Sequence, residues 1–292
     1  MLSRSPSIRC VADCKAILGE GPVWVVREQA LYWVDIKGSR LFRLSEHGGV
    51  TSWDMPEPVC SLAPRAAGGF IAGTRRGFAF VEPENGLFER LGDLEAHLPR
   101  NRMNDGKVDR QGRFWAGTMD DAEEEATGSL YRLHADLNPH RIDEGYLVTN
   151  GPAFSPDGRI LYHTDSARRT IYAFDLDEHG EVANKRVLAR FGEEHGHPDG
   201  MTVDAEGAIW AGFWDGWCVR RLSSDGEMLR TLRLPVQRPT SCAFGGKDLD
   251  RLYVTSARIG LDERALEDQP CAGGLLLIEG VGRGLPERPF AG

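Results

Sequence analysis

The chain has 292 residues, of which 41% are hydrophobic and 27% charged, and its formal net charge is -9 at pH 7. Nucleic acids and anionic membrane surfaces are bound by clustered Lys and Arg, so this acidic balance excludes both as partners. No apolar run approaches the roughly 20 residues that span a bilayer, and the first residues lack the apolar core of a signal peptide, so we expect a cytoplasmic protein.

In chain order, the first predicted element is a strand over residues 8–12, and its expected partner is the apolar run 274–279 near the far end. Between them a short phrase returns six times. Each copy has a polar or small residue, an apolar strand, a turn with glycine, and a second strand that ends in a large anchor. The copies cover residues 20–32, 60–71, 104–115, 150–162, 199–210 and 240–253.

The spacing of the anchors indicates the fold. Successive anchors lie 39 to 48 positions apart, and they are Tyr32, Ile71, Trp115, Tyr162, Trp210 and Tyr253. A repeat of this length, with room for four short strands, is typical of a β-propeller. We therefore predict an all-β fold: a single six-bladed β-propeller domain over residues 1–292, with four antiparallel strands in each blade. The N-terminal strand should close the last blade, because an open blade leaves unpaired strand edges.

Two segments lie outside this pattern. The acidic loop 120–128 follows the third copy, and it is interpreted either as a solvated surface loop or as a lid over the channel mouth. The last dozen residues are rich in Gly, Pro and Arg, and they are expected to form a loose tail.

Equivalent positions at the start of the six copies predict the chemistry. The first strand of every propeller blade lines the central channel, so these residues should form a ring around one mouth; they are Glu20, Cys60, Asn104, Asn150, Asp199 and Thr240. Four of them supply carboxylate or amide oxygens, which suit hard cations such as Ca²⁺, Mg²⁺ or Mn²⁺, and Zn²⁺ also accepts carboxylate oxygen. The alternative is that these residues only form turns, as Asn and Asp before Gly often do.

Two residues near the ring, Arg102 and His197, each lie two positions before a ring residue. Arg102 lies two positions before Asn104, on the same face of an extended strand, where it could bind a sugar hydroxyl, a carboxylate or an oxyanion. The alternative for Arg102 is a salt bridge to the acidic loop. His197 precedes Asp199 by two positions, but a loop histidine without a further role is the interpretation we favour. The sequence contains no GxSxG, HExxH, Walker or GxGxxG motif.

These motifs also resemble those of the senescence marker protein/regucalcin/gluconolactonase family of six-bladed propellers. The matching segments cover nearly the whole chain in order, and they are GEGPVW (19–24), NRMNDGKVD (101–109), GRFWAGTM (112–119), TNGP (149–152), PDGM (198–201), TSCAFGG (240–246) and YVTSAR (253–258).

The resemblance implies roles for particular residues. It implies that Glu20, Asn150 and Asp199 hold one divalent cation, with Asp199 also the general base. It implies that Arg102 and Asn104 bind substrate. The sequence departs from the animal members where those have a substrate-contacting glutamate three residues after Gly-Thr-Met, because Ala122 stands there.

The residues that flank Ala122, Asp121 and Glu123, are our candidates for the shifted substrate contact. The cation is expected to be Ca²⁺ or Zn²⁺, with Mn²⁺, Mg²⁺ and Fe²⁺ as alternatives.

The resulting hypothesis is metal-dependent hydrolysis of a sugar lactone, either gluconolactone or a pentonolactone such as xylono- or arabinono-lactone, to the aldonic acid. The cation activates water and carbonyl, and Asp199 takes the proton. Two alternatives remain open: a non-catalytic calcium-binding regulator, and a promiscuous hydrolase of aryl esters or organophosphates. A small-molecule sugar lactone is the expected partner, and a monomer the expected state.

Overall fold

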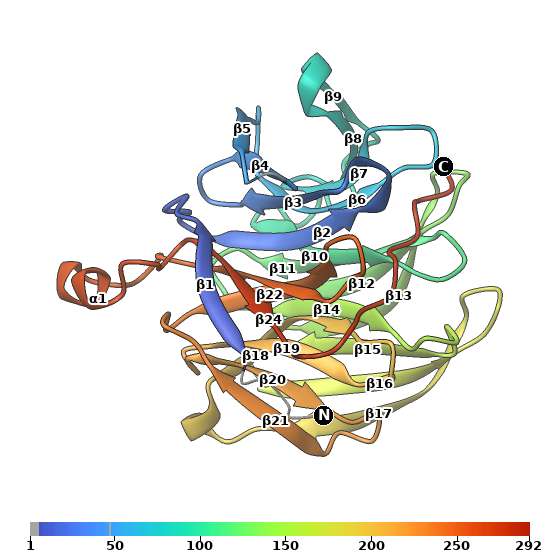
Figure 1. Ribbon diagram of the computed structural model, residues 1–292. Helices are drawn as coiled ribbons and strands as arrows, with labels where there is room; N and C mark the ends of the chain where they lie inside the picture. Colours follow the sequence, from blue (N-terminus) through green and yellow to red (C-terminus); the bar gives the residue numbers. More distant parts are fainter. Residues whose placement is uncertain (1–5, 47) are drawn as a thin grey trace.

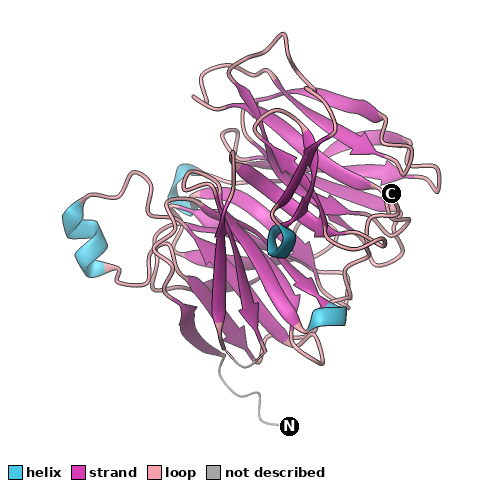
Figure 2. Ribbon diagram, turned by 90° about the horizontal axis from the view of Figure 1, so that it is seen from above, coloured by secondary structure: helices cyan, strands magenta, loops and turns pink. Residues whose placement is uncertain are grey.

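The computed structural model describes residues 6–46 and 48–292, and within them it confirms the predicted fold. Six four-stranded antiparallel sheets are arranged around a central axis (Figures 1 and 2). Helical structure in the described part of the chain is confined to one short α-helix and three single 3-10 turns: α1 (Glu263–Asp268), η1 (Val26–Glu28), η2 (Pro83–Asn85) and η3 (Glu193–His195).

Each of the first three blades is a run of four consecutive strands. Blade one is β2 (Gly19–Val25), β3 (Ala30–Asp35), β4 (Arg40–Ser45) and β5 (Val50–Asp54). Blade two is β6 (Val59–Pro64), β7 (Phe70–Thr74), β8 (Phe78–Glu82) and β9 (Leu87–Arg90). Blade three is β10 (Asn101–Val108), β11 (Phe114–Asp120), β12 (Gly128–Leu133) and β13 (Pro139–Tyr146).

The last three blades complete the ring. Blade four is β14 (Thr149–Phe154), β15 (Ile160–Asp165), β16 (Thr170–Leu176) and β17 (Val182–Arg190). Blade five is β18 (His197–Val203), β19 (Ile209–Trp214), β20 (Cys218–Leu222) and β21 (Met228–Arg233). Blade six is β22 (Pro239–Gly245), β23 (Arg251–Ser256), β24 (Leu275–Glu279) and β1 (Ser7–Ala12).

The N-terminal strand closes blade six, as predicted. Strand β1 pairs antiparallel with β24, with Ile8 opposite Ile278 and Cys10 opposite Leu276. The apolar side chains of this pair are packed into the core cluster of blades five and six. The first and last strands of the ring are therefore held together by main-chain hydrogen bonds and by burial.

Burial falls from the axis outward, so the first strand of each blade is buried even where it carries polar residues, as β10 does. All residues of β2 and β14 are buried, whereas β5 and β9 are mostly exposed. Aromatic pairs link neighbouring blades, each contributing about 0.5–1.5 kcal/mol beyond its buried area; they include Tyr32 with Phe70, Trp115 with Phe154, and Trp24 with Tyr253.

The recurring Asp, Gly and Trp of the phrase form a buried turn. In blade five, Asp204 Oδ1 accepts the backbone N–H groups of Glu206 and Ala208, while Oδ2 accepts Trp210 Nε1 at 2.9 Å and Arg221 Nε at 2.8 Å. Blade three repeats the arrangement around Asp109. In these two blades one carboxylate therefore holds the hairpin turn and the anchor indole together.

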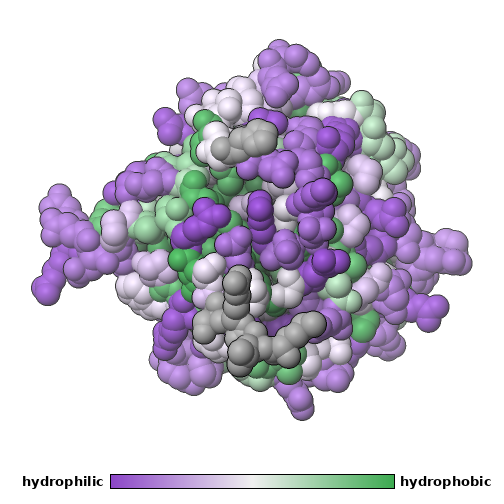
Figure 3. Space-filling model, viewed as in Figure 1, coloured by the Kyte–Doolittle hydropathy of each residue, from purple (hydrophilic) through white to green (hydrophobic). Residues whose placement is uncertain are grey.

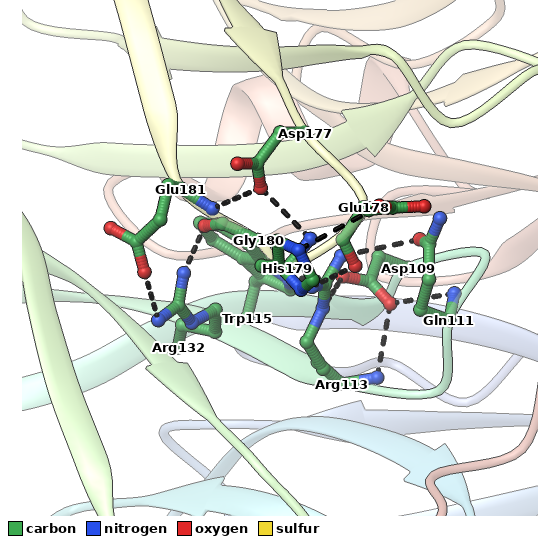
Figure 4. A network of polar contacts seen from close by, with 10 residues as sticks. All are labelled: Asp109, Gln111, Arg113, Trp115, Arg132, Asp177, Glu178, His179, Gly180 and Glu181. Carbon is green, nitrogen blue, oxygen red and sulfur yellow. Dashed lines mark hydrogen bonds and ion pairs between the residues drawn. The ribbon is translucent and has the colours of Figure 1, made fainter.

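In blade three the hydrogen bonds around this turn extend to blade four (Figure 4). Arg113 donates to Asp109 Oδ2 at 2.5 Å and to the carbonyl of Glu178 at 3.0 Å, and Arg132 donates to the carbonyl of Gly180. Both arginines are almost fully buried. The hairpin of blade three is thus bonded to the β16–β17 turn of its neighbour.

The expectation of a loose tail is wrong. Residues 281–292 cross from blades five and six to blades two and three: Ala205 donates to the carbonyl of Arg283, and the backbone of Phe290 bonds Pro64 and Ala66. Phe290 is fully buried in a core cluster, and Lys107 Nζ lies 3.4 Å from Glu287 Oε1. The isolated phenylalanine anchors a segment whose composition alone gave no sign of order.

The segment that carries α1 projects from blade six as a hydrophilic lobe (Figures 1 and 3). Asp262 caps the helix by accepting the backbone N–H of Ala265. Among the described helices, no span is long and apolar enough to cross a membrane.

Candidate functional site

Four of the six predicted ring residues lie on a cavity of about 390 Å³ at one mouth of the channel. Residues of blades one, three, four, five and six line it; they are Leu18, Glu20, Lys37, Arg102, Asn104, Met119, Asp121, Glu123, Val148, Asn150, Ser166, Ala167, His197, Asp199, Trp214, Arg238, Ile259 and Gly260. The cavity thus brings together the seven residues that the sequence analysis assigned to the cation or the substrate, and they are Glu20, Arg102, Asn104, Asp121, Glu123, Asn150 and Asp199.

The strand register confirms that the ring positions are equivalent. In each blade the residue three positions after the ring residue pairs with the anchor of the second strand. Val23 pairs with Tyr32, Ala153 with Tyr162, and Thr202 with Trp210, so Glu20, Asn150 and Asp199 occupy the same register. Of the described ring residues, Cys60 and Thr240 are fully buried and do not line the cavity.

A β-bulge lies next to each of the predicted cation ligands Glu20, Asn150 and Asp199. The register shifts between Glu20 and Val23, between Asn150 and Ala153, and between Pro198 and Met201. The residues after Glu20 and Asn150 are glycines with positive φ, +54° at Gly21 and +70° at Gly151. A bulge re-aims the neighbouring side chain, and glycine adopts this backbone conformation without strain. The Glu-Gly and Asn-Gly pairs of the sequence therefore turn donors toward the axis.

Asn104 orients Asn150. Asn104 Nδ2 donates to Asn150 Oδ1 at 3.0 Å and to the carbonyl of Thr149 at 2.6 Å. Asn150 Nδ2 donates to Ser166 Oγ at 2.9 Å, which fixes the amide so that its oxygen keeps a second lone pair. Asn104 Oδ1 accepts the cationic Arg102 at 2.6 Å, whereas Asn150 Oδ1 accepts only a neutral amide N–H. A metal cation beside the Arg102 guanidinium would be repelled, so Asn150 is the better cation ligand and Asn104 the residue that positions it.

Glu20 and Asp199 bring two carboxylates into a buried space. Both are about 5% exposed. Burial, followed by the charges of Asp199 and Asp105, holds the pKa of Glu20 well above its ordinary value. Burial and the charge of Asp105 do the same to the pKa of Asp199. Ionising both acids here is costly unless a cation joins them.

The donor set fits a divalent cation. Asp199 Oδ1 is buried and has no hydrogen-bond partner among the described residues. Of Glu20, only Oε2 accepts a hydrogen bond within that part of the chain, from the backbone of Gly21 at 3.1 Å. The described residues hold no cluster of three or more His, Cys, Asp or Glu placed to bind a metal. Two carboxylates and an amide oxygen need no such cluster, and they suit hard cations.

Arg102 lies in the cavity and also makes the predicted salt bridge. Its Nε donates to Asp121 Oδ1 at 2.5 Å, and one terminal nitrogen, NH1, donates to Asn104 and to the carbonyl of Met103. Its other terminal nitrogen, NH2, has no hydrogen-bond partner within residues 6–46 and 48–292. Arg102 is therefore held rigidly, with one donor edge left for a ligand.

Asp121 is surrounded by cations. Besides Arg102, Lys37 Nζ lies 2.7 Å from its Oδ1 and Arg75 lies 3.6 Å from its Oδ2. Burial raises the pKa of Asp121, but the hydrogen bonds and charges of Lys37 and Arg102 outweigh it and hold the pKa below its ordinary value. The carboxylate is thus fixed in its ionised form, where it positions Arg102.

The acidic loop forms part of the cavity rim. Asp120 is buried and accepts the backbone N–H groups of Ala122, Glu124 and Glu125, which fixes the turn. Glu123 adopts a positive φ of +59° and lines the cavity with Asp121. Glu124 and Glu125 are solvent-exposed and pair with Arg100. The loop is therefore a surface turn with one side on the cavity.

A second layer of residues was largely missed. Five cavity residues lie two positions before a ring position, and they are Leu18, Arg102, Val148, His197 and Arg238. The spacing that pointed to Arg102 would have found Arg238 as well, had it been applied to every copy. His197, which we favoured as a plain loop residue, lines the cavity and contacts the carbonyl of Ser166 through Nδ1 at 2.9 Å. Lys37 lies just after the second strand β3 and Trp214 ends the second strand β19, and neither position belongs to the repeated phrase.

Comparisons with known proteins give consistent results. Residues 18–258 match the family model described as the SMP-30/Gluconolactonase/LRE-like region. The chain is 38% identical to 6-deoxy-6-sulfogluconolactonase of Pseudomonas putida over 98% of this chain and 99% of the relative. It is 40% identical to regucalcin of Sus scrofa, covering 99% of both chains.

Two further similarities bear on the site. The chain is 39% identical to L-arabinolactonase of Azospirillum brasilense over 97% of this chain and 95% of the relative. The crystal structure of a calcium-binding protein, regucalcin, from Agrobacterium tumefaciens superposes with a TM-score of 0.92 at 28% identity, covering 97% of both chains. On its full-length relatives and its family match, this chain belongs to the SMP-30/gluconolactonase/LRE-like family.

Proposed function

We propose that this chain hydrolyses a sugar lactone to the aldonic acid, with one divalent cation held by Glu20, Asn150 and Asp199. The observation that carries the proposal is the buried Asp199 Oδ1, which has no partner in the described part of the chain and lies with Glu20 in the same cavity. Relatives named as sugar lactonases, each aligned over nearly its full length, support the reaction class.

A bound divalent cation would polarise the lactone carbonyl and make water a stronger nucleophile at neutral pH. It would also favour the ionised forms of Glu20 and Asp199, because an adjacent positive charge offsets the burial and the like charges that raise their pKa values. Asn104 and Ser166 hold the Asn150 oxygen in place for it. We expect Ca²⁺ or Zn²⁺ to be the most effective, with Mn²⁺, Mg²⁺ and Fe²⁺ as alternatives.

The chain's own residues handle the proton and the developing charge. Asp199 takes a proton from the attacking water, whose oxygen bonds to the carbonyl carbon. The NH2 edge of Arg102 donates to the carbonyl oxygen as it becomes negative, or to a neighbouring sugar hydroxyl. The bond between the acyl carbon and the ring oxygen then breaks, and the ring oxygen receives the proton from Asp199. The product acid ionises at neutral pH.

The substrate is a hydroxyl-rich lactone in this proposal. Arg102 and Glu123 present polar groups to the cavity, while Leu18, Met119 and Val148 supply apolar contact for ring carbons. Gluconolactone and the pentonolactones are both candidates, since relatives are named for a hexonolactone derivative and for arabinolactone. Aryl esters fit less well, because the described cavity residues include one indole, Trp214, one imidazole, His197, and no Phe or Tyr.

A calcium-binding role without catalysis is the second candidate. The names of two relatives favour it, regucalcin of Sus scrofa and the calcium-binding regucalcin of Agrobacterium tumefaciens. The two candidates differ in one respect only: both bind a cation through the same oxygens, but only the lactonase turns a lactone over.

The test is lactone hydrolysis followed with a pH indicator. Chelator-treated protein would receive each divalent metal in turn, with D-glucono-, D-galactono-, D-xylono- and L-arabinono-lactone as substrates. Turnover that disappears with chelator and returns with metal supports the proposal, and Asp199→Asn should reduce it at least a thousandfold. Thermal stabilisation by a cation without turnover of any lactone would favour the binding protein instead.

A further inference from the structure

We propose that Arg238 recognises an anionic group on the substrate, so that the preferred lactone carries a phosphate, sulfonate or carboxylate away from its reacting carbonyl. This inference rests on the proposed lactonase function and names the substrate class more narrowly. Arg238 lines the same cavity as Glu20 and Asp199, directly before β22 of blade six.

Arg238 is held rigidly on three sides. Its Nε donates to Asp215 Oδ1 at 2.7 Å, its NH1 donates to the carbonyl of Ile259, and its guanidinium lies 4.8 Å from the centre of the Trp214 ring. The side chain is only 15% exposed. NH2 is the one nitrogen of this guanidinium without a hydrogen-bond partner in the described residues. A fixed guanidinium with one uncommitted edge is well suited to bind an oxyanion.

The charge of Arg238 is only partly offset. Asp215 is 35% exposed, and its Oδ1 also accepts Gln237 Nε2 at 2.9 Å. Asp215 bonds Nε, and the neighbouring NH2 makes no hydrogen bond within the described residues, so an anionic ligand can reach NH2 without displacing Asp215. Arg238 thus offers a donor that the fold does not use.

Cations are also in excess around the rest of the mouth. On neighbouring blade one, Lys37 shares Asp121 with Arg75 and Arg102, so that three cations surround a single carboxylate. Once a divalent cation offsets Glu20 and Asp199, the three basic side chains that line the cavity, Lys37, Arg102 and Arg238, outnumber the two remaining acids of its lining, Asp121 and Glu123. A positive mouth on a chain of net charge -9 would concentrate anionic ligands there.

The two layers of the cavity then divide the work. The inner layer of Glu20, Asn150 and Asp199 meets the reacting carbonyl, and Arg238 in the outer layer meets the distant substituent. Arg238 binds a group that does not react, so its interaction is equally strong in the ground and transition states. Its loss should therefore raise KM for an anionic lactone and leave kcat for that lactone nearly constant.

The experiment compares kcat/KM for D-glucono-1,5-lactone with that for its 6-phospho and 6-sulfo derivatives and for a glucarolactone, using metal-loaded enzyme. The three anionic arms identify which anion is preferred. We expect at least one anionic lactone to exceed the neutral one tenfold or more. Arg238→Gln should lower that ratio by about ten- to a hundredfold, mainly through KM, and Arg238→Lys should retain part of it.

Arg264→Gln, on the exposed helix α1, is the matched control and should leave the ratio unchanged. Hydrolysis of the neutral lactone without an anionic preference in the wild type would overturn this inference alone. An anionic preference that Arg238→Gln leaves intact would overturn it too. Absence of turnover with all lactones and metals would overturn the proposed function, and this inference with it. The wild-type ratio and Arg238→Lys keep the test decisive if Arg238→Gln does not fold.

Discussion

Asp121 should act through Arg102 and not through the substrate, and a double-mutant cycle can separate the two roles. Its carboxylate lies 2.5 Å from Arg102 Nε, and the Arg102 side chain is only 5% exposed. A charge-assisted hydrogen bond of this kind contributes about 1.5–3 kcal/mol. Asp121 itself is 27% exposed, so solvent screening places the bond near the lower end of that range.

A loss of about 1.5 kcal/mol corresponds to roughly a tenfold fall in kcat/KM for Asp121→Asn. The assay is initial-rate hydrolysis of the best lactone by wild type, Asp121→Asn, Arg102→Lys and the double variant. If Asp121 only positions Arg102, its effect should largely vanish in the Arg102→Lys background. The coupling energy then equals about 1.5 kcal/mol.

Additive effects of the two substitutions, within about 0.5 kcal/mol, would refute this reasoning and make Asp121 a direct substrate contact. Asp175→Asn is the matched control, because Asp175 forms an exposed ion pair with Arg186 on blade four, away from the cavity. Its kcat/KM should equal that of wild type. Thermal unfolding of all variants shows whether any loss of rate reflects loss of fold.

Three further predictions concern stability. Burial lowers the pKa of His163 to about 3, whereas the unfolded histidine titrates near 6.5. Acid therefore favours the unfolded chain, and the free energy of unfolding should fall by about 2 kcal/mol from pH 7 to pH 5. Measured by urea denaturation, the free energy of unfolding of His163→Phe should fall less over that interval, and a fall equal to that of wild type would contradict this. Asp204→Asn places an amide against Trp210 and Arg221 and should cost about 3 kcal/mol, whereas a change below about 1 kcal/mol would show that the turn tolerates it. Deleting residues 1–12 should lower the melting temperature by exposing the edge of β24, and an unchanged melting temperature would argue against closure by β1.

The architecture was predictable because the sequence repeat and the strand register coincide. The two clearest Asp–Gly–Trp copies have a physical reason for their pattern, since the buried Asp109 and Asp204 each hold a turn and an anchor indole. Counting back from the anchors then located Glu20, Asn150 and Asp199 in one cavity. Equivalent positions in a closed ring must lie near the same mouth, so sequence spacing translates directly into proximity.

The division of roles within the site was less predictable. The sequence pattern did not distinguish Asn104 from Asn150, and only the side-chain hydrogen bonds show that the Asn104 oxygen accepts a guanidinium while the Asn150 oxygen accepts a neutral amide. Asp121 was a candidate for the family's substrate contact, yet its ion pairs are with the basic side chains Lys37, Arg75 and Arg102. Such assignments depend on side-chain directions, which spacing along the chain does not contain.

The tail shows a different limit. Residues 281–292 have no repeat and no periodic apolar pattern, and one buried phenylalanine, Phe290, fixes their course. A single anchor gives no statistical signal in a Gly- and Pro-rich segment. Lys37 was missed for a related reason, because it lies in a turn outside the repeated phrase.

The closure of blade six by β1 has a consequence for synthesis of the chain. Strand β1 is made first and its partner β24 nearly last; at about 5–20 residues per second the delay is roughly 15 to 55 s. The tail that bonds blades two and three is made later still. A chain that stops short of residue 275 can complete five blades but presents an open sixth, with bare strand edges where chaperones and proteases recognise unfinished proteins.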